Sequence, residues 1–286
     1  MSYPDTALEL NDTSDIDVPL NSMNCGTEST KLGTPIEPTK DFRKKNIEEF
    51  HPSLALSSLA AFIETYFKIH FTLNIYDMNL HAWTHRAENS LLDSGFLELT
   101  KEQIHSYDFN VLAISCQFQI HQRWVDEIIS WLPNSRSENA TIVGGGFASV
   151  FPEEAIRNDG VDYAVIGEGE HTFVHILNRI CGHSDPQFEK EWPFDGYAIR
   201  SSNGKCFVEP KKIFLSNLAS IPPPNWNIPG LEEHVLKYPD TRFPFMATRG
   251  CPMQCSFCNT DQQWGKRVRT RTVQHVVDEL KQAYDQ

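Results

Sequence analysis

The first strong pattern of apolar residues begins near residue 54, after a long polar stretch. From Leu56 to Phe67, apolar residues recur three and four positions apart, which predicts a helix with one buried face. Residues 71–75 then alternate between apolar and polar side chains, as a half-buried strand does. Residues 111–116 form a short, largely apolar run, which predicts a strand buried on both faces.

The alternation of helices and strands continues along the chain. The further predicted elements are a helix at 124–132, a strand at 141–146, a short helix at 152–158 with proline in its first turn, a strand at 163–167 and a helix at 173–180. Repeated units of this kind predict an α/β fold, a Rossmann-like, doubly wound parallel sheet with helices on both faces. Right-handed crossovers bring the carboxyl ends of the strands to one edge, where such sheets bind ligands.

Outside this region the chain divides into three further parts. Residues 1–45 are polar and follow neither period, so we expect a disordered leader before a domain of residues 46–185. Residues 186–240 predict a linker that contains a small hairpin with an Asn-Gly turn. Residues 241–286 predict one strand, a loop and one helix. One such unit cannot bury its apolar face, so we expect an incomplete domain and a fragment that is inactive alone.

Composition narrows the possible classes of function. The formal net charge of −13 argues against general nucleic-acid binding. No apolar run approaches the ~18 residues of a membrane span, and seven cysteines without a small-domain framework favour the cytoplasm. Residues 242–271 have a positive local net charge, with six cations and one anion. This basic segment is either a solvated surface or a wall that binds carboxylates or phosphates.

The densest chemical signal is a group of three cysteines, Cys251, Cys255 and Cys258, spaced C-x3-C-x2-C. Soft thiolates at this density select an iron–sulfur cluster or zinc. A [4Fe–4S] cluster usually takes four cysteines, one per iron, so three would leave one iron open to a substrate or cofactor. The alternatives are a disulfide and a structural zinc site with His275 as fourth ligand, although the sequence lacks the second ligand pair usual for zinc.

The cysteine loop resembles that of the radical S-adenosylmethionine (SAM) superfamily, which has this spacing and an aromatic residue before the third cysteine, here Phe257. The resemblance implies a [4Fe–4S] cluster on the three cysteines and SAM bound to its open iron. It also implies that Phe257 contacts the adenine of SAM, and that residues 241–286 begin a (β/α) partial barrel.

Glycines and small polar residues gather where the predicted strands end, at Ser115, Gly144–Gly146 and Gly167–Glu170. Glycine lets a large ligand approach the backbone closely. The pattern is not G-x-G-x-x-G, so a nicotinamide or flavin dinucleotide is not expected. From about residue 52 to 181 the chain resembles the cobalamin-binding domain that precedes many radical SAM domains.

That resemblance implies that the corrin packs over the strand ends while its nucleotide tail threads between the sheet and the helices. The lining residues would be Ser115, Gly144, Gly145, Ser149 and Gly167. Two features depart from the family. The D-x-H-x-x-G motif, which supplies a lower histidine ligand in other cobalamin enzymes, is absent, because Asp77 is followed by His81 and His85. No first strand is visible before Pro52, because residues 41–50 are charged and favour a helix or loop.

Together the resemblances imply a B12-dependent radical SAM enzyme that methylates an unactivated carbon through a 5′-deoxyadenosyl radical and methylcobalamin. Its partners would be an electron donor of the flavodoxin or ferredoxin type and a small-molecule or peptide substrate, with no nucleic acid and no membrane. Two alternatives remain open. One is a truncated, non-catalytic module that binds cobalamin or the iron–sulfur cluster, and the other is radical SAM chemistry that cyclises or rearranges its substrate.

Overall fold

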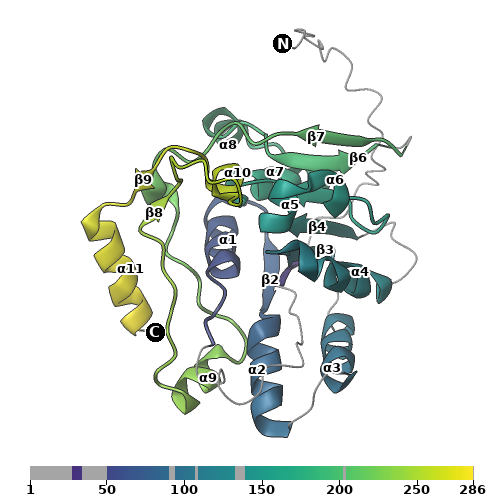
Figure 1. The fold of residues 1–286 in the computed structure, drawn as a ribbon, viewed down its shortest axis with the longest axis vertical. Helices are drawn as coiled ribbons and strands as arrows, with labels where there is room; N and C mark the ends of the chain where they lie inside the picture. Colours follow the sequence, from purple (N-terminus) through teal and green to yellow (C-terminus); the bar gives the residue numbers. More distant parts are fainter. Residues whose placement is uncertain are drawn as a thin grey trace.

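The computed structural model describes residues 28–33, 50–89, 94–106, 109–132, 139–201 and 204–285. Its main feature is a seven-stranded sheet in the order β2-β1-β3-β4-β5-β6-β7 (Figure 1). Strands β1 to β5 run parallel, and β6 and β7 add an antiparallel edge. The strands are β1 Glu28–Gly33, β2 Phe71–Tyr76, β3 Val111–Ser115, β4 Ala140–Gly144, β5 Tyr163–Val165, β6 Tyr197–Arg200 and β7 Cys206–Glu209.

Helices cover both faces of the sheet, as the sequence predicts, and each face has its own apolar core. β3 contributes to both cores: Val111 and Ala113 pack in one, and Leu112 and Ile114 pack in the other. Successive side chains of a strand point to opposite faces, which explains the unbroken apolar run. The helices are α1 Leu54–Tyr66, α2 Met78–Asn89, α3 Ser94–His105, α4 Gln122–Ser130, α5 Gly146–Val150, α6 Pro152–Ala155, α7 Glu170–Ile180 and α8 Pro186–Glu191.

β1 corrects one part of the prediction of a disordered leader, because Glu28–Gly33 lies inside residues 1–45; the rest of that range lies outside the described residues. This strand pairs in parallel with β2 on one side and β3 on the other. It supplies, from farther upstream, the strand that was not visible before Pro52. Its sequence contains a single large apolar residue, so no apolar pattern marks it. Residues 41–49, expected to form a helix or loop, lie outside the described residues.

The predicted hairpin of the linker is present, but it belongs to the main sheet. β6 pairs antiparallel with both β5 and β7. After the hairpin, Leu215, Leu218 and Ile221 pack in the same core as α1 and α7, as does Leu231 of α9 (Leu231–Lys237). Residues 186–240 are therefore part of the α/β domain and not a separate linker. The tip of the hairpin, residues 202–203, lies outside the described residues.

The cysteine segment follows this domain. β8 (Thr248–Arg249) and β9 (Arg269–Thr270) form a two-stranded antiparallel sheet, and α10 (Thr260–Trp264) comes between them in sequence. α11 (Val273–Asp285) lies at the edge of the molecule, away from the main sheet (Figure 1). Among the residues described, no helix combines the length and the apolar character needed to cross a membrane.

Candidate functional site: a pocket at the sheet edge beside the cysteine loop

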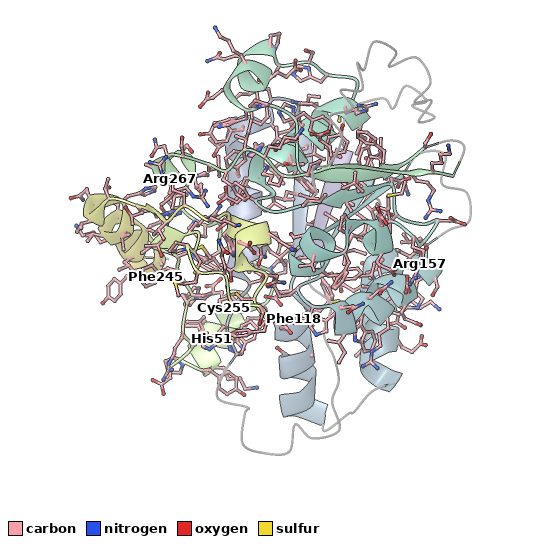
Figure 2. All side chains as sticks on the ribbon, turned by 45° about the horizontal axis from the view of Figure 1, so that its top comes forward. His51, Phe118, Arg157, Phe245, Cys255 and Arg267 are labelled. Atoms are coloured by element: carbon pink, nitrogen blue, oxygen red, sulfur yellow. The ribbon has the colours of Figure 1, made fainter. Side chains whose placement is uncertain are left out.

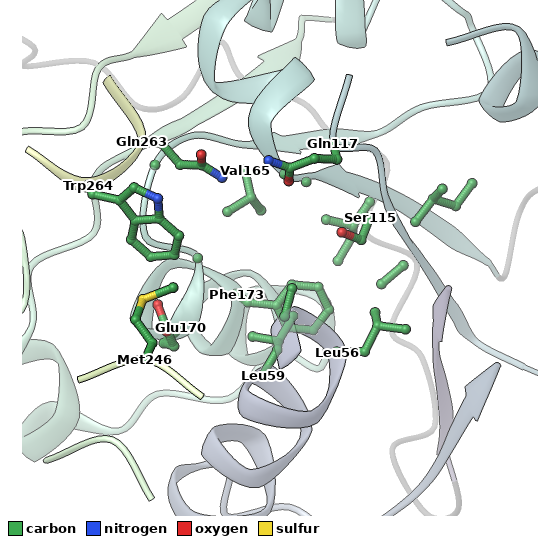
Figure 3. Close-up of a pocket in the computed structure, with 18 residues that line it drawn as sticks. Leu56, Leu59, Ser115, Gln117, Val165, Glu170, Phe173, Met246, Gln263 and Trp264 are labelled. Atoms are coloured by element: carbon green, nitrogen blue, oxygen red, sulfur yellow. The ribbon is translucent and has the colours of Figure 1, made fainter. Parts of the chain in front are cut away.

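A cavity of about 380 Å³ opens at the carboxyl edge of the parallel strands. It extends inward to Ala113, Ile142 and Val165, so it lies between the sheet and the helices α1 and α7. Figure 3 shows Leu56, Leu59 and Phe173 on its helical side. Apolar walls with few polar groups are typical of pockets that bind organic cofactors.

Four of the five predicted cobalamin contacts line this cavity, namely Ser115, Gly144, Gly145 and Gly167. The fifth, Ser149, is not part of the lining. Its hydroxyl donates to the carbonyl oxygen of Gly145 at 2.8 Å and accepts from the N–H of Gly167 at 2.9 Å. Ser149 therefore ties two of the lining loops together, and its assignment to direct cofactor contact stays a prediction.

Two of these positions require glycine. Gly145 has φ of +96°, and a Cβ there would lie 2.6 Å from the carbonyl oxygen of Cys116. Gly167 has φ of +73°, and its Cβ would lie 2.8 Å from Cγ of Lys211. Residues other than glycine rarely adopt a positive φ, and neither site has space for a Cβ atom. Because these two glycines carry no side chain, a ligand can approach the backbone closely at the edge of the pocket.

The three cysteines lie around a second cavity, of about 190 Å³, together with Thr260 and Lys266. Cys255 and Cys258 are exposed, and Cys251 is half-buried. The hydrogen bond with Thr260 lowers the pKa of the Cys258 thiol. An accessible thiol with a lowered pKa is suited to binding a metal as thiolate.

The arrangement of the cysteines bears on the choice between a cluster and zinc. In the described part of the chain, no three His, Cys, Asp or Glu side chains are close enough together to hold a single metal ion. His275, the proposed fourth zinc ligand, does not line the cysteine cavity. A cluster that takes one thiolate per iron needs its sulfurs spread around a space, and the cavity provides such a space.

α10 connects the two cavities. Thr260 and Asp261, at its start, line the cysteine cavity, whereas Gln263 and Trp264, at its end, line the pocket at the sheet edge. Met246, before β8, completes the wall on this side (Figure 3). Figure 2 places the labelled Cys255 in the middle of the view, with Phe245 and Arg267 toward α11. The two candidate cofactor sites therefore share one short helix.

A buried ion cluster fastens the cysteine segment to the α/β domain. Arg269 donates from Nη1 to both carboxylate oxygens of Glu168, at 2.7 and 2.9 Å, and also to the carbonyl oxygen of Leu215. Arg249 donates to Glu170 at 2.6 Å and lies 3.5 Å from Glu168. Burial raises the pKa of Glu168, and the adjacent Glu170 raises it further. Burial opposes the charged form of Glu170 as well, but Arg249 outweighs it and lowers that pKa.

A second buried network lies beneath the Gly167 turn. The ammonium of Lys211 lies 2.7 Å from Nε2 of His171 and 3.1 Å from Asp195. Burial lowers the pKa of both Lys211 and His171. Burial would raise the pKa of Asp195, but hydrogen bonding from His171 and the charge of Lys211 hold it well below its usual value. None of these three residues lines the pocket, so the network supports the turn.

The residues near the absent histidine motif have structural contacts. Asp77 accepts hydrogen bonds from the N–H groups of Ser53 at 3.0 Å and Asn79 at 2.9 Å, so it fixes the starts of α1 and α2. The ring of His81 stacks on Tyr76, with 4.3 Å between ring centroids. Neither Asp77 nor His81 lines the pocket.

Some functional residues were not predicted from the sequence. Arg249, Arg269 and Arg271 were read as part of a basic segment, but all three are buried in ion pairs with glutamates. The pocket wall formed by Gln263 and Trp264 carries no sequence signal, since it depends on how α10 packs against the sheet edge.

Comparisons with known proteins find a family match and several similar proteins. Residues 43–177 match the family described as "B12 binding domain". Over 226 residues the chain is 26% identical to cytidylyl-2-hydroxyethylphosphonate methyltransferase of Streptomyces wedmorensis, covering 68% of this chain and 40% of the relative. It is 33% identical over 149 residues to an uncharacterized methyltransferase of Pyrococcus horikoshii, covering 50% of this chain and 30% of that protein. The chain thus spans less than half the length of these relatives.

A solved structure shows the same fold. The cobalamin-dependent S-adenosylmethionine radical enzyme OxsB, with aqua-cobalamin and S-adenosylmethionine bound, superposes with a TM-score of 0.64 at 15% identity. The match covers 90% of this chain and 31% of that enzyme. Residues 43–177 therefore match the B12 binding domain family, and the chain shares the fold of the cobalamin-dependent S-adenosylmethionine radical enzyme OxsB.

Proposed function

We propose that this protein is a cobalamin-dependent radical SAM methyltransferase. The observation that carries the proposal is the position of α10, whose first residues line the cysteine cavity and whose last residues line the pocket at the sheet edge. Holding two cofactors next to each other brings their reactive parts to one substrate. The names of the relatives, which include methyltransferases and a radical SAM enzyme, support the same class of reaction.

Cobalamin would occupy the pocket at the sheet edge. The apolar space between the sheet and α1 and α7 suits the benzimidazole end of the nucleotide tail, and it excludes water from that group. Gly145 and Gly167 let the larger corrin approach the strand ends closely. Ser115 offers a hydroxyl at the carboxyl end of β3, where it reaches the pocket.

The cysteine cavity would hold a [4Fe–4S] cluster on Cys251, Cys255 and Cys258, one thiolate per iron, with SAM at the fourth iron. Phe257 is 90% exposed, so its ring is accessible to the adenine. When bound, the cluster and SAM supply radical activation of a carbon–hydrogen bond, and cobalamin supplies the methyl group. A one-electron donor of the flavodoxin or ferredoxin type belongs to the proposal.

The test begins with anaerobic reconstitution with iron and sulfide, followed by iron analysis and titration with hydroxocobalamin. We expect about four irons per chain and one bound corrin. Changing Cys251, Cys255 or Cys258 to Ala should abolish iron binding. Cys206→Ala is the matched control, since Cys206 is also exposed but lies in β7, outside the cysteine cavity.

Other outcomes would change the assignment. Stoichiometric zinc that resists replacement by iron would refute the cluster. A protein that binds no corrin would refute the cobalamin pocket. An intact cluster and bound corrin without cleavage of SAM under a strong reductant would favour a non-catalytic binding module.

A further inference from the structure

The pocket at the sheet edge offers few polar groups to a ligand. Its wall is mostly apolar, and in such pockets the few polar side chains set the orientation of the bound molecule. Glu170 belongs to the lining, but one of its carboxylate oxygens accepts a hydrogen bond within the ion cluster and the other is buried. The remaining polar side chains of the lining are Ser115, Gln117, Gln263 and Trp264.

The two glutamines of this set come from different parts of the molecule. Gln117 follows β3 in the α/β domain, and Gln263 belongs to α10 in the cysteine segment. Figure 3 shows them on opposite sides of the pocket, with their amide ends turned toward each other. Gln117 is exposed, and neither amide atom of the half-buried Gln263 is enclosed, so a ligand can reach both. Within the part of the chain that the structure describes, neither amide has a hydrogen-bond partner.

The backbone that carries Gln117 is fixed by the turn after β4. The N–H of Cys116 donates to the carbonyl oxygen of Gly144 at 2.8 Å, and the carbonyl oxygen of Cys116 accepts from the N–H of Phe147 at 3.0 Å. A Cβ at Gly146 would lie 2.5 Å from the carbonyl oxygen of Gln117 and 3.3 Å from its Nε2. The third glycine of the Gly-Gly-Gly run is therefore needed because the loop of Gln117 passes directly against it.

Gln263 is held in place by the packing of α10. Its N–H donates to the carbonyl oxygen of Asn259 at 3.2 Å, and α10 contacts α5. α10 also lies against the turn after β5, because the carbonyl oxygen of Gln262 is 3.4 Å from the position that a Cβ at Gly167 would take. A side chain on a fixed backbone loses less freedom when it binds a ligand, so both amides are pre-organised at the pocket.

We propose that Gln117 and Gln263 form an amide clamp, in which each glutamine hydrogen-bonds a primary amide side chain on the rim of the corrin from its own side of the pocket. This role rests on the proposed cobalamin site and adds the side chains that orient the ring. A glutamine amide carries both a donor and an acceptor, so it satisfies the N–H and the carbonyl oxygen of another primary amide together. Because Gln263 is part of α10, the bound corrin also joins the cysteine segment to the α/β domain.

Each glutamine of the amide clamp has a matched control close to it in sequence. Gln119 comes two residues after Gln117, and Gln262 precedes Gln263 in the same helix. Both controls are exposed, and neither lines the pocket at the sheet edge or the cysteine cavity. Substitution of a control by alanine therefore removes the same amide group without removing a contact to the pocket ligand.

The first experiment compares dissociation constants for hydroxocobalamin, measured by its absorption spectrum. We expect Gln117→Ala and Gln263→Ala each to weaken binding about threefold or more, the range for one lost hydrogen bond between neutral groups. Gln119→Ala and Gln262→Ala should stay within about twofold of the wild-type protein, and all four variants should keep its melting temperature. Wild-type affinity in either clamp variant, or an equal loss in its control, would overturn the proposal.

A corrin without the nucleotide tail shows which part of the ligand the amide clamp contacts. Cobinamide keeps the rim amides of cobalamin but has no benzimidazole, so Gln117→Ala and Gln263→Ala should weaken its binding by the same factors. Losses with hydroxocobalamin but not with cobinamide would assign the glutamines to the tail and overturn the proposal. A wild-type protein that binds hydroxocobalamin but not cobinamide would overturn it too, because the rim would then add nothing to affinity. Failure of the wild-type protein to bind hydroxocobalamin at all would refute the proposed function itself.

The second experiment tests whether the corrin joins the cysteine segment to the α/β domain. A ligand held by Gln263 should restrain α10, so the backbone amides of this helix should exchange with deuterium more slowly when corrin is bound. We expect saturating hydroxocobalamin to slow exchange in the peptide containing α10 about threefold or more in the wild-type protein and in Gln262→Ala, but not in Gln263→Ala. Absence of slowing in the wild-type protein would refute the link, and undiminished slowing in Gln263→Ala would assign it to other contacts.

Discussion

The substitution Gly250→Ala tests how tightly the cysteine loop is held by its own backbone. Gly250 lies between Arg249 and Cys251 and has φ of +92°. A Cβ at this position would lie 2.1 Å from the carbonyl oxygen of Arg267 and 2.8 Å from its carbonyl carbon. Both contacts are with backbone, so no side-chain rotation relieves them. The segment that carries Arg267, just before β9, must move away by roughly 1 Å before the contact becomes ordinary.

The expected cost has two parts. Holding alanine at positive φ costs about 1–2 kcal/mol. Forcing an extra methyl group into a packed site costs about 1–3 kcal/mol more. We therefore expect Gly250→Ala to lower the free energy of unfolding by about 2–5 kcal/mol. Because the relief separates β8 from β9, the cysteines should also lose their places around the cavity.

Gly204→Ala measures the cost of positive φ without the cost of the steric contact. Gly204, in the turn between β6 and β7, has φ of +78°, but a Cβ there meets no atom within 4 Å. This variant should lose only about 1–2 kcal/mol and keep its full iron content. Urea unfolding gives the free energies, and iron analysis after anaerobic reconstitution reports the loop. If Gly250→Ala were no less stable than Gly204→Ala and bound iron fully, the argument from backbone contact would be refuted.

Three further predictions use simpler measurements. Burial raises the pKa of the Cys116 thiol to about 12, so iodoacetamide should not modify Cys116 in the folded protein at pH 8. The exposed cysteines of the metal-free loop should react under the same conditions, and early modification of Cys116 would contradict its burial. The nitrogen splitting in the paramagnetic resonance spectrum of bound cob(II)alamin should be the same in His81→Ala as in the wild-type protein, because His81 lies outside the pocket. Loss of this splitting in the variant would identify His81 as the lower ligand. Asp195→Asn should cost about 2 kcal/mol at pH 7. The pKa of Asp195 is lower in the folded state, since hydrogen bonding from His171 and the charge of Lys211 outweigh its burial, so this stabilisation is present above about pH 4 and is lost as the pH falls toward the folded pKa. Urea unfolding at several pH values should therefore show the difference between the two proteins shrinking below pH 4, and a constant difference would contradict the assigned charge.

The sequence alone determined the features that depend on local spacing. The run 111–116 was identifiable as a strand buried on both faces because its neighbouring side chains fill opposite cores, so every position must be apolar or small. Glycines at the strand ends were identifiable because positive φ and close backbone approach restrict the residue type. The cysteine spacing placed three thiols on one loop, and a loop of that length keeps them around one cavity.

Other elements could not be predicted, because their neighbours come from distant parts of the chain. β1 has no apolar alternation, and its place between β2 and β3 depends on pairing with strands that follow it in sequence. The hairpin β6–β7 was identifiable by its turn, but its attachment to β5 is a tertiary contact. Backbone pairing of this kind leaves little trace in residue type.

Only the tertiary structure decided how the cysteine segment joins the α/β domain. Glu168 and Arg269 are 101 residues apart in sequence, and their hydrogen bonds form because the Gly167 turn and β9 are brought together. In the sequence Arg249 and Arg269 belong to a basic segment, whereas in the fold each forms an ion pair with a buried glutamate. A charged side chain becomes stable in the interior only when a partner and hydrogen bonds are present, and no local pattern encodes a partner so far away.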